Sequence, residues 1–436
     1  MMLTVLILLY LAVLLWLGIR GNTTDKTIGS LLTTSGSMSS TLCALSLVST
    51  IIGGSATLGI GSLAQKIGSA AFWWLGVGAI GLVIHGLFVA PYIRQSKAIT
   101  LPHLLDQQIG RKAQRWAGLI IAVSWIAVTA AQFCALRALL GVVVGGNVAD
   151  ILYALLTGGI VLHTAMGGQR GVIKTDAFQA VLLLAGFTLT ALWCLTERPQ
   201  EVLALPKIPF NASFGFGNWL EMMILVGLTF VIGPDMFSRA FAAKSPGAAQ
   251  KAALGAAPIL AFFGIVVTMM ALINIDAKQP ITDWLSPNSP LPTLLQAMLA
   301  LGLVSALSGS ANTLLLSAAG ILEKDVLGQD RPQAVRYWSV AIGLLAFSSA
   351  WVSGDIIGWL LKAYSLFVPG VAAPLLFVVV GGLRKAHAGI WLLSAVIGGV
   401  FGLTGNLTGN SLWTFAGIGL SSLGALYSVL IVRSKN

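Results

Sequence analysis

Two long apolar stretches of the sequence are interrupted near their middles, by Ile51-Ile52-Gly53-Gly54-Ser55 and by Val231-Ile232-Gly233-Pro234-Asp235. Glycine costs a helix interior about 1 kcal/mol and proline about 3 kcal/mol, so each interruption predicts a point where a helix unwinds. Counted from residues 38 and 218, where we begin the two stretches, the first glycine of each interruption lies 15 residues further along. The alternative is that Gly53 and Gly54 only allow close helix packing and that Pro234 is an ordinary kink.

The composition of the 436-residue chain places these stretches in a membrane. Hydrophobic residues make up 57% of the chain, charged residues only 9%, and the mean hydropathy is +0.90. A soluble domain carries about 25% charged residues and a disordered chain needs low hydrophobicity, so both classes are excluded. Apolar runs of about 20 residues, each long enough to cross a hydrocarbon core of about 30 Å, recur from end to end. The fold class is therefore an all-α polytopic membrane protein.

Thirteen such runs predict thirteen transmembrane helices. We place them at residues 3–20, 38–65, 70–93, 116–145, 148–166, 173–195, 218–242, 251–275, 294–322, 334–352, 355–380, 386–404 and 411–432. The stretches between them are too short for a second domain. We therefore expect residues 1–436 to form a single transmembrane domain.

The basic residues predict how the chain is oriented. With an odd number of helices the termini lie on opposite sides, and 19 of the 25 Lys and Arg, including Lys26, Arg239 and Lys435, then fall on the side of the C-terminus. Four, including Lys207, fall on the other side, and two lie within helices. Because basic residues gather in cytoplasmic loops, we predict an N-terminus outside and a cytoplasmic C-terminus in a bacterial inner membrane. Small scattered clusters are not the single basic patch that binds nucleic acid.

The two interrupted helices also predict an internal symmetry. The second begins five helices after the first, an odd number, so it runs in the opposite direction. Transporters often contain two inverted repeats with interrupted helices in matching places. We predict a five-plus-five inverted repeat over residues 38–195 and 218–380. An extra N-terminal helix with its loop (1–37) precedes it, and two extra C-terminal helices (386–436) follow.

The ninth predicted helix carries the largest set of small polar residues, within residues 304–317. Helical periodicity places Ala306, Ser310, Thr313 and Ser317 on one stripe. Uncharged hydroxyl and carbonyl oxygens are what a monovalent cation needs in place of its water shell. The alternative is that these hydroxyls bond to carbonyl groups of their own helix.

Of the charged residues placed at membrane depth, where a charge needs a partner, three bear on a functional site. Asp176 begins the sixth helix, where the helix dipole favours a carboxylate. Arg137 lies deep in the fourth helix, and we expect it to pair with a carboxylate of the protein or of a substrate. Asp235 follows the second interruption, and of two roles, a site residue or a cap of the resumed helix, we favour the cap.

The sequence contains no convincing enzyme motif. Its four histidines show no metal-ligand spacing, and neither Gly-x-Ser-x-Gly nor a phosphate-binding loop occurs. We therefore expect neither enzymatic activity nor an organic cofactor.

Four short motifs occur in the order, and on the helices, where a known family has them. They are Thr100-Leu101-Pro102-His103-Leu104-Leu105, Gly167-Gly168 with Val172–Gln179, Gly233–Asp235 with Arg239–Lys244, and Ser310–Leu315. They resemble the T.PE.L loop, the GG…V…TD..Q signature, the G.PH…RF.AAK stretch and the (S/T)-A-(D/S)-S-L-L stretch of the sodium:solute symporter family. The resemblance covers nearly the whole chain. It implies a LeuT-like fold of the APC superfamily, in which sodium entry is coupled to uptake of sugars, amino acids, carboxylates or vitamins.

The resemblance also implies site residues. The main sodium site is expected between the first interrupted helix and the ninth helix, at Ser49, Ile52, Ala306, Gly309 and Ser310. A second cation site, used by some members, is expected at Asp176, Asn312 and Thr313. The solute is expected to meet Gly53, Ser55, Phe230 and Arg137, of which Arg137 matches an arginine that anchors substrate in a carboxylate-transporting branch.

Two departures from the family pattern bear on the expected function. Gly309 replaces a serine hydroxyl, and small residues around the first interruption disfavour a polyhydroxylated solute. We expect sodium-coupled symport, by alternating access, of a small solute that bears a carboxylate, such as an amino acid or a monocarboxylate. Proton coupling through Asp176, or a membrane sensor that binds ligand without transport, are the alternatives. The expected partners are the solute, sodium and the lipid bilayer, with no obligate protein partner.

Overall fold

The computed structural model describes residues 2–21, 27–206 and 209–434. Within these ranges the chain is helical, with two isolated β-bridges and no strand. Lys26, Lys207 and Lys435 of the charge count, and residues 22–26 of the first predicted loop, lie outside the described residues.

The helices have the following bounds. They are α1 (Met2–Gly21), α2 (Ile28–Thr33), α3 (Ser40–Ile51), α4 (Ile60–Ile67), α5 (Trp73–Phe88), α6 (Ala90–Gln95), α7 (Leu101–Gln108), α8 (Arg111–Val143), α9 (Gly146–Glu197), α10 (Pro199–Ala204), α11 (Phe216–Met222), α12 (Leu228–Val231), α13 (Pro234–Ala242), α14 (Pro246–Ile273), α15 (Thr293–Ile321), α16 (Pro332–Ser349), α17 (Ile356–Phe367), α18 (Ala373–Val379), α19 (Ala388–Thr408) and α20 (Ser411–Ser434).

Among the described residues, nine helical segments are long and apolar enough to cross a membrane, and two shorter apolar helices lie at Leu3–Leu17 and Ser40–Ile51. The predicted helices at 148–166 and 173–195 both fall within α9, which is 52 residues long. A single straight helix of that length would extend about 78 Å, more than twice the thickness of the hydrocarbon core. Gly168 interrupts α9 with φ 55° and ψ −169°, a conformation that glycine adopts without strain. Because Gly168 breaks the helical geometry, α9 consists of two helices, one on each side of that glycine, which correspond to the two predicted helices.

Both predicted helix interruptions are confirmed. The helix α3 ends at Ile51, and Ile52 has the non-helical angles φ −82° and ψ 83° before a π-helical turn at Ser55–Gly59 leads into α4. The helix α12 ends at Val231, and Ile232 has φ −128° and ψ 70° before Pro234 begins α13. Proline suits this first helical position because its missing N–H is one that the helix start leaves unpaired anyway.

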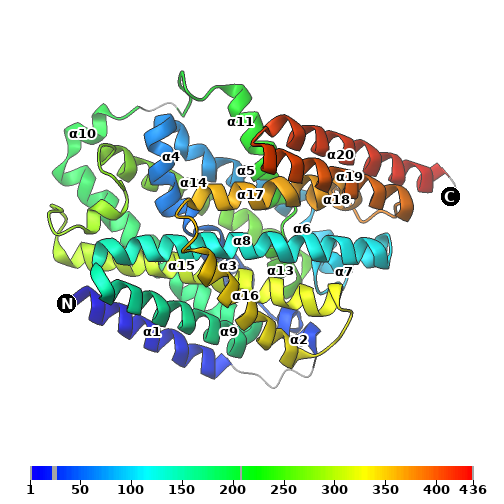
Figure 1. Cartoon of the computed structure of the whole chain (residues 1–436), viewed down its shortest axis with the longest axis horizontal. Helices are drawn as coiled ribbons and strands as arrows, with labels where there is room; N and C mark the ends of the chain where they lie inside the picture. Colours follow the sequence, from blue (N-terminus) through cyan, green and yellow to red (C-terminus); the bar gives the residue numbers. More distant parts are fainter. Residues whose placement is uncertain (1, 22–26, 207–208, 435–436) are drawn as a thin grey trace.

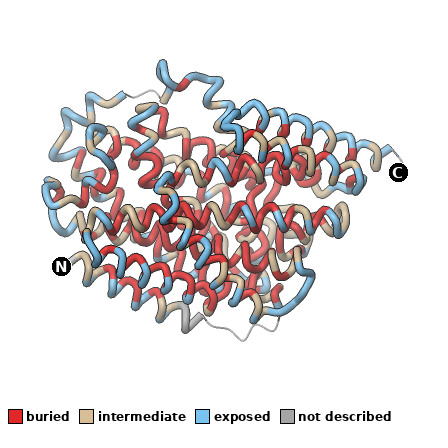
Figure 2. The backbone as a smooth tube through the Cα atoms, in the orientation of Figure 1, coloured by how far each residue is buried: buried red, intermediate tan, exposed pale blue. Residues whose placement is uncertain are grey.

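The helices α8 and α15 cross the middle of the molecule, with α1 and α9 on one side and α19 and α20 on the other (Figure 1). The helix α15 packs against α9, α8 and α3, and most of its side chains are buried (Figure 2). Its small residues allow this, because glycine, alanine and serine let helix backbones approach closely. The polar residues of the ninth predicted helix are therefore in the interior of the protein.

Candidate ion and substrate site

The break after α3 leaves two backbone carbonyl groups without their helical partners. Gly53 N–H donates to the Ile51 carbonyl rather than to that of Ser49. Gly54 N–H donates to Gln132 Oε1 of α8, at 2.7 Å, rather than to the Thr50 carbonyl. Ser310 Oγ of α15 donates instead to the carbonyl oxygens of Thr50, at 2.7 Å, and of Ser49, at 3.4 Å. The unwound segment is thus joined to α15 through a serine hydroxyl.

Three oxygen atoms lie close to Gly309, one residue before Ser310, and two of them have no hydrogen-bond partner within the described part of the chain. A Cβ atom at position 309 would overlap Ser49 Oγ and would lie 3.0 Å from Gln179 Oε1 and 3.3 Å from the Ser49 carbonyl oxygen. Ser49 Oγ and Gln179 Oε1 are both buried and have no hydrogen-bond partner within the described part of the chain. Buried polar atoms without a partner are rare and costly, so these two oxygens are suited to a ligand.

The orientation of the Gln179 side chain is set by its amide nitrogen. Gln179 Nε2 donates to Tyr10 Oη of α1, at 2.7 Å, and to Ser308 Oγ of α15, at 3.0 Å. The Tyr10 hydroxyl in turn lies 2.5 Å from Ser308 Oγ. With both amide hydrogens used, the carbonyl oxygen of Gln179 is turned toward Gly309. The N-terminal helix therefore contributes to this site through Tyr10, although neither Tyr10 nor Gln179 is among the predicted site residues.

The structure brings together three of the five predicted sodium residues, namely Ser49, Gly309 and Ser310. The other two, Ile52 and Ala306, are fully buried in the unwound segment and in α15. Every polar atom that converges here is a neutral oxygen. A hard monovalent cation binds such ligands, whereas a transition metal prefers nitrogen or sulfur. The donor set therefore fits sodium.

The predicted second cation position contains a guanidinium group. Arg239 of α13 is 1% exposed, and its Nη2 atom lies 2.8 Å from Asp176 Oδ2 and 2.5 Å from Thr313 Oγ1. The same nitrogen donates to Thr50 Oγ1 at 2.7 Å, and Arg239 Nε donates to Ser46 Oγ at 2.9 Å. The arginine thus occupies the space between Asp176 and Thr313.

Two sequence-based expectations change as a result. Arg239, counted above with the cytoplasmic loops, is a buried residue of α13. Asn312 does not join Asp176 and Thr313 at the guanidinium, because its Oδ1 atom accepts a hydrogen bond from Thr164 of α9 at 2.9 Å. The sequence signal for the buried ion pair was present, since Arg239 stands in one recognised motif and Asp176 in another. Their proximity depends on tertiary packing.

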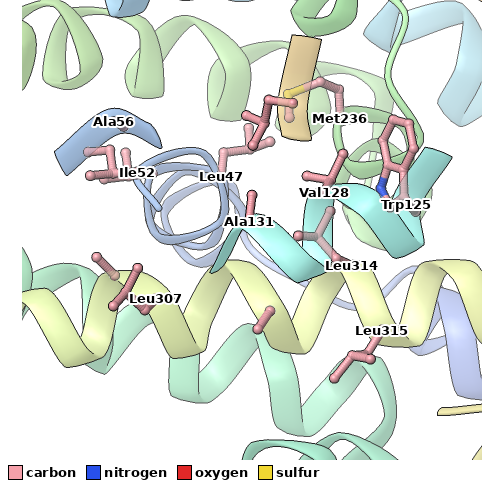
Figure 3. Close-up of a cluster of buried hydrophobic side chains, with 14 of the residues drawn as sticks. Leu47, Ile52, Ala56, Trp125, Val128, Ala131, Met236, Leu307, Leu314 and Leu315 are labelled. Atoms are coloured by element: carbon pink, nitrogen blue, oxygen red, sulfur yellow. The ribbon is translucent and has the colours of Figure 1, made fainter. Parts of the chain in front are cut away.

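A cavity lies beside the two helix breaks, with about 50 Å³ in which the centre of a water molecule can be placed. It is lined by Thr50, Ile51, Ser55, Trp74, Leu75, Trp125, Val128, Gln132, Val226, Thr229, Phe230, Asp235, Met236, Leu314, Leu360 and Tyr364. Figure 3 shows part of its wall, with Trp125 and Val128 of α8 between Met236 of α13 and Leu314 of α15. Such a cavity accommodates several water molecules or a small solute.

The predicted substrate residues are divided between this cavity and other places. Ser55 and Phe230 line the cavity. Gly53 lies next to it, where a Cβ atom would overlap Gln132 Oε1 and lie 2.5 Å from Ser310 Oγ. Arg137 is not among the lining residues.

The partners of the Arg137 side chain lie outside the cavity. Its side chain is 37% exposed, its Nε atom lies 3.8 Å from Asp150 Oδ1, and its guanidinium stacks on Trp351 at 3.6 Å. Of the two partners that the sequence left open, a carboxylate of the protein or of a substrate, the structure shows the first. Arg137 follows Gln132 by five residues, which turns its side chain about 140° around the helix axis from the cavity.

Asp235 is not the cap of α13, so that expectation is wrong. The residue at the N-cap position of α13 is Gly233, so no side chain caps the first turn of this helix. Asp235 instead faces the cavity, and its Oδ1 atom accepts a hydrogen bond from Trp125 Nε1 at 3.0 Å. Its carboxylate joins the second broken helix to α8.

Comparison with known proteins gives a consistent result. The model of the sodium:solute symporter family matches residues 31–381. The sodium/pantothenate symporter of Haemophilus influenzae is 25% identical over 359 residues, which cover 74% of this chain and 71% of that protein. The high-affinity choline transporter 1 of Torpedo marmorata is 25% identical over 308 residues, which cover 62% of this chain and about half (51%) of that protein.

Two solved structures show the fold. A substrate-bound, outward-open Na⁺-coupled sialic acid symporter superposes with a TM-score of 0.77 at 14% identity, covering 100% of this chain and 98% of that one. A nucleobase-cation-symport-1 family transporter in a closed conformation, with bromovinylhydantoin bound, superposes with a TM-score of 0.61 at 12% identity, covering 92% and 94% of the two chains. At such identities the likeness concerns architecture alone.

Proposed function

The chain belongs to the sodium:solute symporter family, and on that premise we propose that it couples the entry of sodium to the uptake of a small organic solute by alternating access. It is a multi-pass membrane transporter with a LeuT-like fold. One observation supports the sodium site above all others. The carbonyl groups freed at the break after α3 meet the Ser310 hydroxyl and the unpaired oxygens of Ser49 and Gln179 around Gly309.

In this proposal sodium binds to Ser49, Ile52, Ala306 and Ser310, with Gln179 Oε1 and Ser49 Oγ in place of the serine hydroxyl that position 309 lacks. The ion links the unwound segment of α3 to α15. A ligand shifts a conformational equilibrium only by its difference in affinity between two states. Sodium that requires α3 and α15 in contact therefore favours the state in which the adjacent cavity is formed. By reciprocity, the solute then strengthens sodium binding.

The membrane topology forms part of the proposal. We propose thirteen transmembrane helices, a five-plus-five repeat over residues 38–195 and 218–380, and an inner-membrane location with the C-terminus in the cytoplasm. The backbone pairing of Met38 with Ala242 and Lys244 supports the inversion, because it sets the segment before α3 beside the end of α13. Two broken helices that lie side by side in opposite directions are what an inverted repeat requires.

The class of solute is a separate question from sodium coupling. The prediction of a carboxylate-bearing solute depended on Arg137 as its anchor. The contacts of Arg137 with Asp150 and Trp351 remove that support, since the guanidinium already has a carboxylate and an aromatic partner outside the cavity.

Replacing Ser310 with alanine is expected to weaken sodium binding about tenfold or more, because the ion loses a hydroxyl ligand and the Thr50 carbonyl loses its donor. The measurement is thermal unfolding in detergent, with sodium chloride titrated against potassium chloride at constant ionic strength. A ligand at a hundredfold excess over its dissociation constant stabilises the folded state by about 2.7 kcal/mol. Ser339→Ala is the control, since Ser339 is a buried serine of α16 that donates only to its own helix. An unchanged sodium response in Ser310→Ala contradicts the assignment.

Replacing Gln179 with leucine is expected to weaken the same sodium response about tenfold, because leucine keeps the volume but removes the carbonyl oxygen that faces Gly309. Tyr10→Phe is expected to have a smaller effect in the same direction, since Gln179 then loses one of two anchoring bonds. Gln169→Leu, another buried glutamine of α9, is the control. Equal sodium affinity in Gln179→Leu and the unmodified protein excludes Gln179 as a ligand.

A further inference from the structure

We infer that the cavity beside the helix breaks takes a small organic cation, such as a quaternary or protonated amine, rather than an anion. This inference rests on the proposed function, because it treats the cavity as the site from which solute is transported. Four observations carry it: the charge of the lining, the engagement of the nearest arginine, the aromatic residues of the wall and the uncharged polar residues of the lining.

Asp235 is the only charged residue among those that line the cavity. It is only partly buried, and its Oδ1 atom is held by Trp125 Nε1 at 3.0 Å. A counter-charge stabilises a carboxylate in such a cavity, because burying an unpaired charge is costly. A cationic solute supplies that counter-charge.

No residue of the protein neutralises Asp235 within the described ranges. The nearest arginine along the chain, Arg239, follows one helical turn later, but its guanidinium is engaged by Asp176, Thr50 and Thr313. No ion pair joins Asp235 to a basic residue of the described chain at 4.0 Å or less. The carboxylate therefore remains available to a ligand.

The walls around Asp235 are aromatic. Trp74, Trp125, Phe230 and Tyr364 line the cavity from α5, α8, α12 and α17. Aromatic faces attract a cation through their negative quadrupole, by about 0.5–2 kcal/mol each, whereas the same faces repel the charge of a carboxylate placed over them. Trp125 also donates its indole N–H to Asp235, so one residue orients the carboxylate and forms part of the aromatic wall.

The rest of the lining limits the size and the polarity of the solute. Thr50 and Ser55 border the cavity near the first helix break and Thr229 borders it near the second, so a hydroxyl or a neutral polar group on the cation has partners. The small volume excludes large solutes. An anion would instead face Asp235 in a medium of low dielectric constant, where like charges repel strongly.

The test measures thermal unfolding in saturating sodium with a panel of four probes: choline, its neutral isostere 3,3-dimethyl-1-butanol, glycine betaine and lactate. We expect choline to raise the unfolding temperature in a saturable way, and the neutral isostere and lactate to have no effect. Betaine distinguishes a strict cation site from one that also accepts a zwitterion. Asp235→Asn is expected to weaken the choline response at least about tenfold while the sodium response persists, because the amide keeps the shape but not the charge.

Asp150→Asn is the matched control, since Asp150 is a carboxylate 53% exposed that contacts only Arg137. Stabilisation of the unmodified protein by lactate, equal binding of choline and its neutral isostere, or no effect of choline on a protein that responds to sodium each overturns the inference. Loss of the sodium response in the unmodified protein instead contradicts the proposed function. The two failures are therefore distinguishable.

Discussion

Replacing Arg239 with methionine is expected to destabilise the protein by about 3–5 kcal/mol, because it leaves the buried carboxylate of Asp176 without its counter-charge. The guanidinium is 1% exposed and the carboxylate is not exposed at all, so solvent cannot replace the lost partner. The change also removes hydrogen bonds to Ser46, Thr50 and Thr313, which connect α13 to α3 and α15.

The double variant Arg239→Met with Asp176→Leu tests the physical cause. Apolar replacement of both members of a buried ion pair is often neutral or stabilising, so the double variant is expected to recover most of the lost stability. Reversible unfolding in detergent compares the unmodified protein with the two variants. If the double variant is as unstable as Arg239→Met, the loss comes from packing and hydrogen bonding rather than from the unpaired charge.

The same variants report on the second cation position. In Arg239→Met the carboxylate of Asp176 and the hydroxyl of Thr313 are free of the guanidinium, so sodium is expected to stabilise this variant through an additional saturable site. The double variant is expected to lack that component. If the sodium titration of Arg239→Met shows only one saturable component, Asp176 and Thr313 do not form a cation site even when the guanidinium is absent.

Replacing Gly53 with alanine is expected to abolish most of the sodium response and to destabilise the protein by about 1–3 kcal/mol. The added methyl group would overlap Gln132 Oε1 and lie 2.5 Å from Ser310 Oγ. Gln132 Oε1 holds Gly54 N–H, and Ser310 Oγ holds the Thr50 carbonyl, so moving either group disrupts the geometry of the break. Thermal unfolding in sodium and in potassium measures both effects.

Gly158→Ala in α9 is the control for the general effect of losing a glycine. A Cβ atom there meets nothing within 4 Å, and alanine is favoured over glycine in a helix by about 1 kcal/mol. We expect Gly158→Ala to be neutral or stabilising with an intact sodium response. An intact sodium response in Gly53→Ala contradicts the proposed location of the site.

The sequence by itself determined the features that depend on local physics. Apolar runs predict membrane helices because polar backbone groups must be satisfied within the segment. The glycines and the proline at residues 53–54 and 233–234 predict the two breaks because they weaken a helix wherever they occur. Ser310 was predicted on the polar stripe of its helix, and it lies there, bonded to the carbonyl groups that the first break releases.

Only the tertiary structure decided which side chains meet. Asp176 and Arg239 are 63 residues apart, and Gln179 and Tyr10 are 169 residues apart, so no local rule relates them. For a related reason, Arg137 contacts Asp150 rather than the cavity, and Asp235 faces the cavity rather than capping α13. Composition and hydropathy locate a residue along a helix, but its rotation about the axis and the neighbours on that face are set by packing, and a charge takes the partner that packing brings within reach.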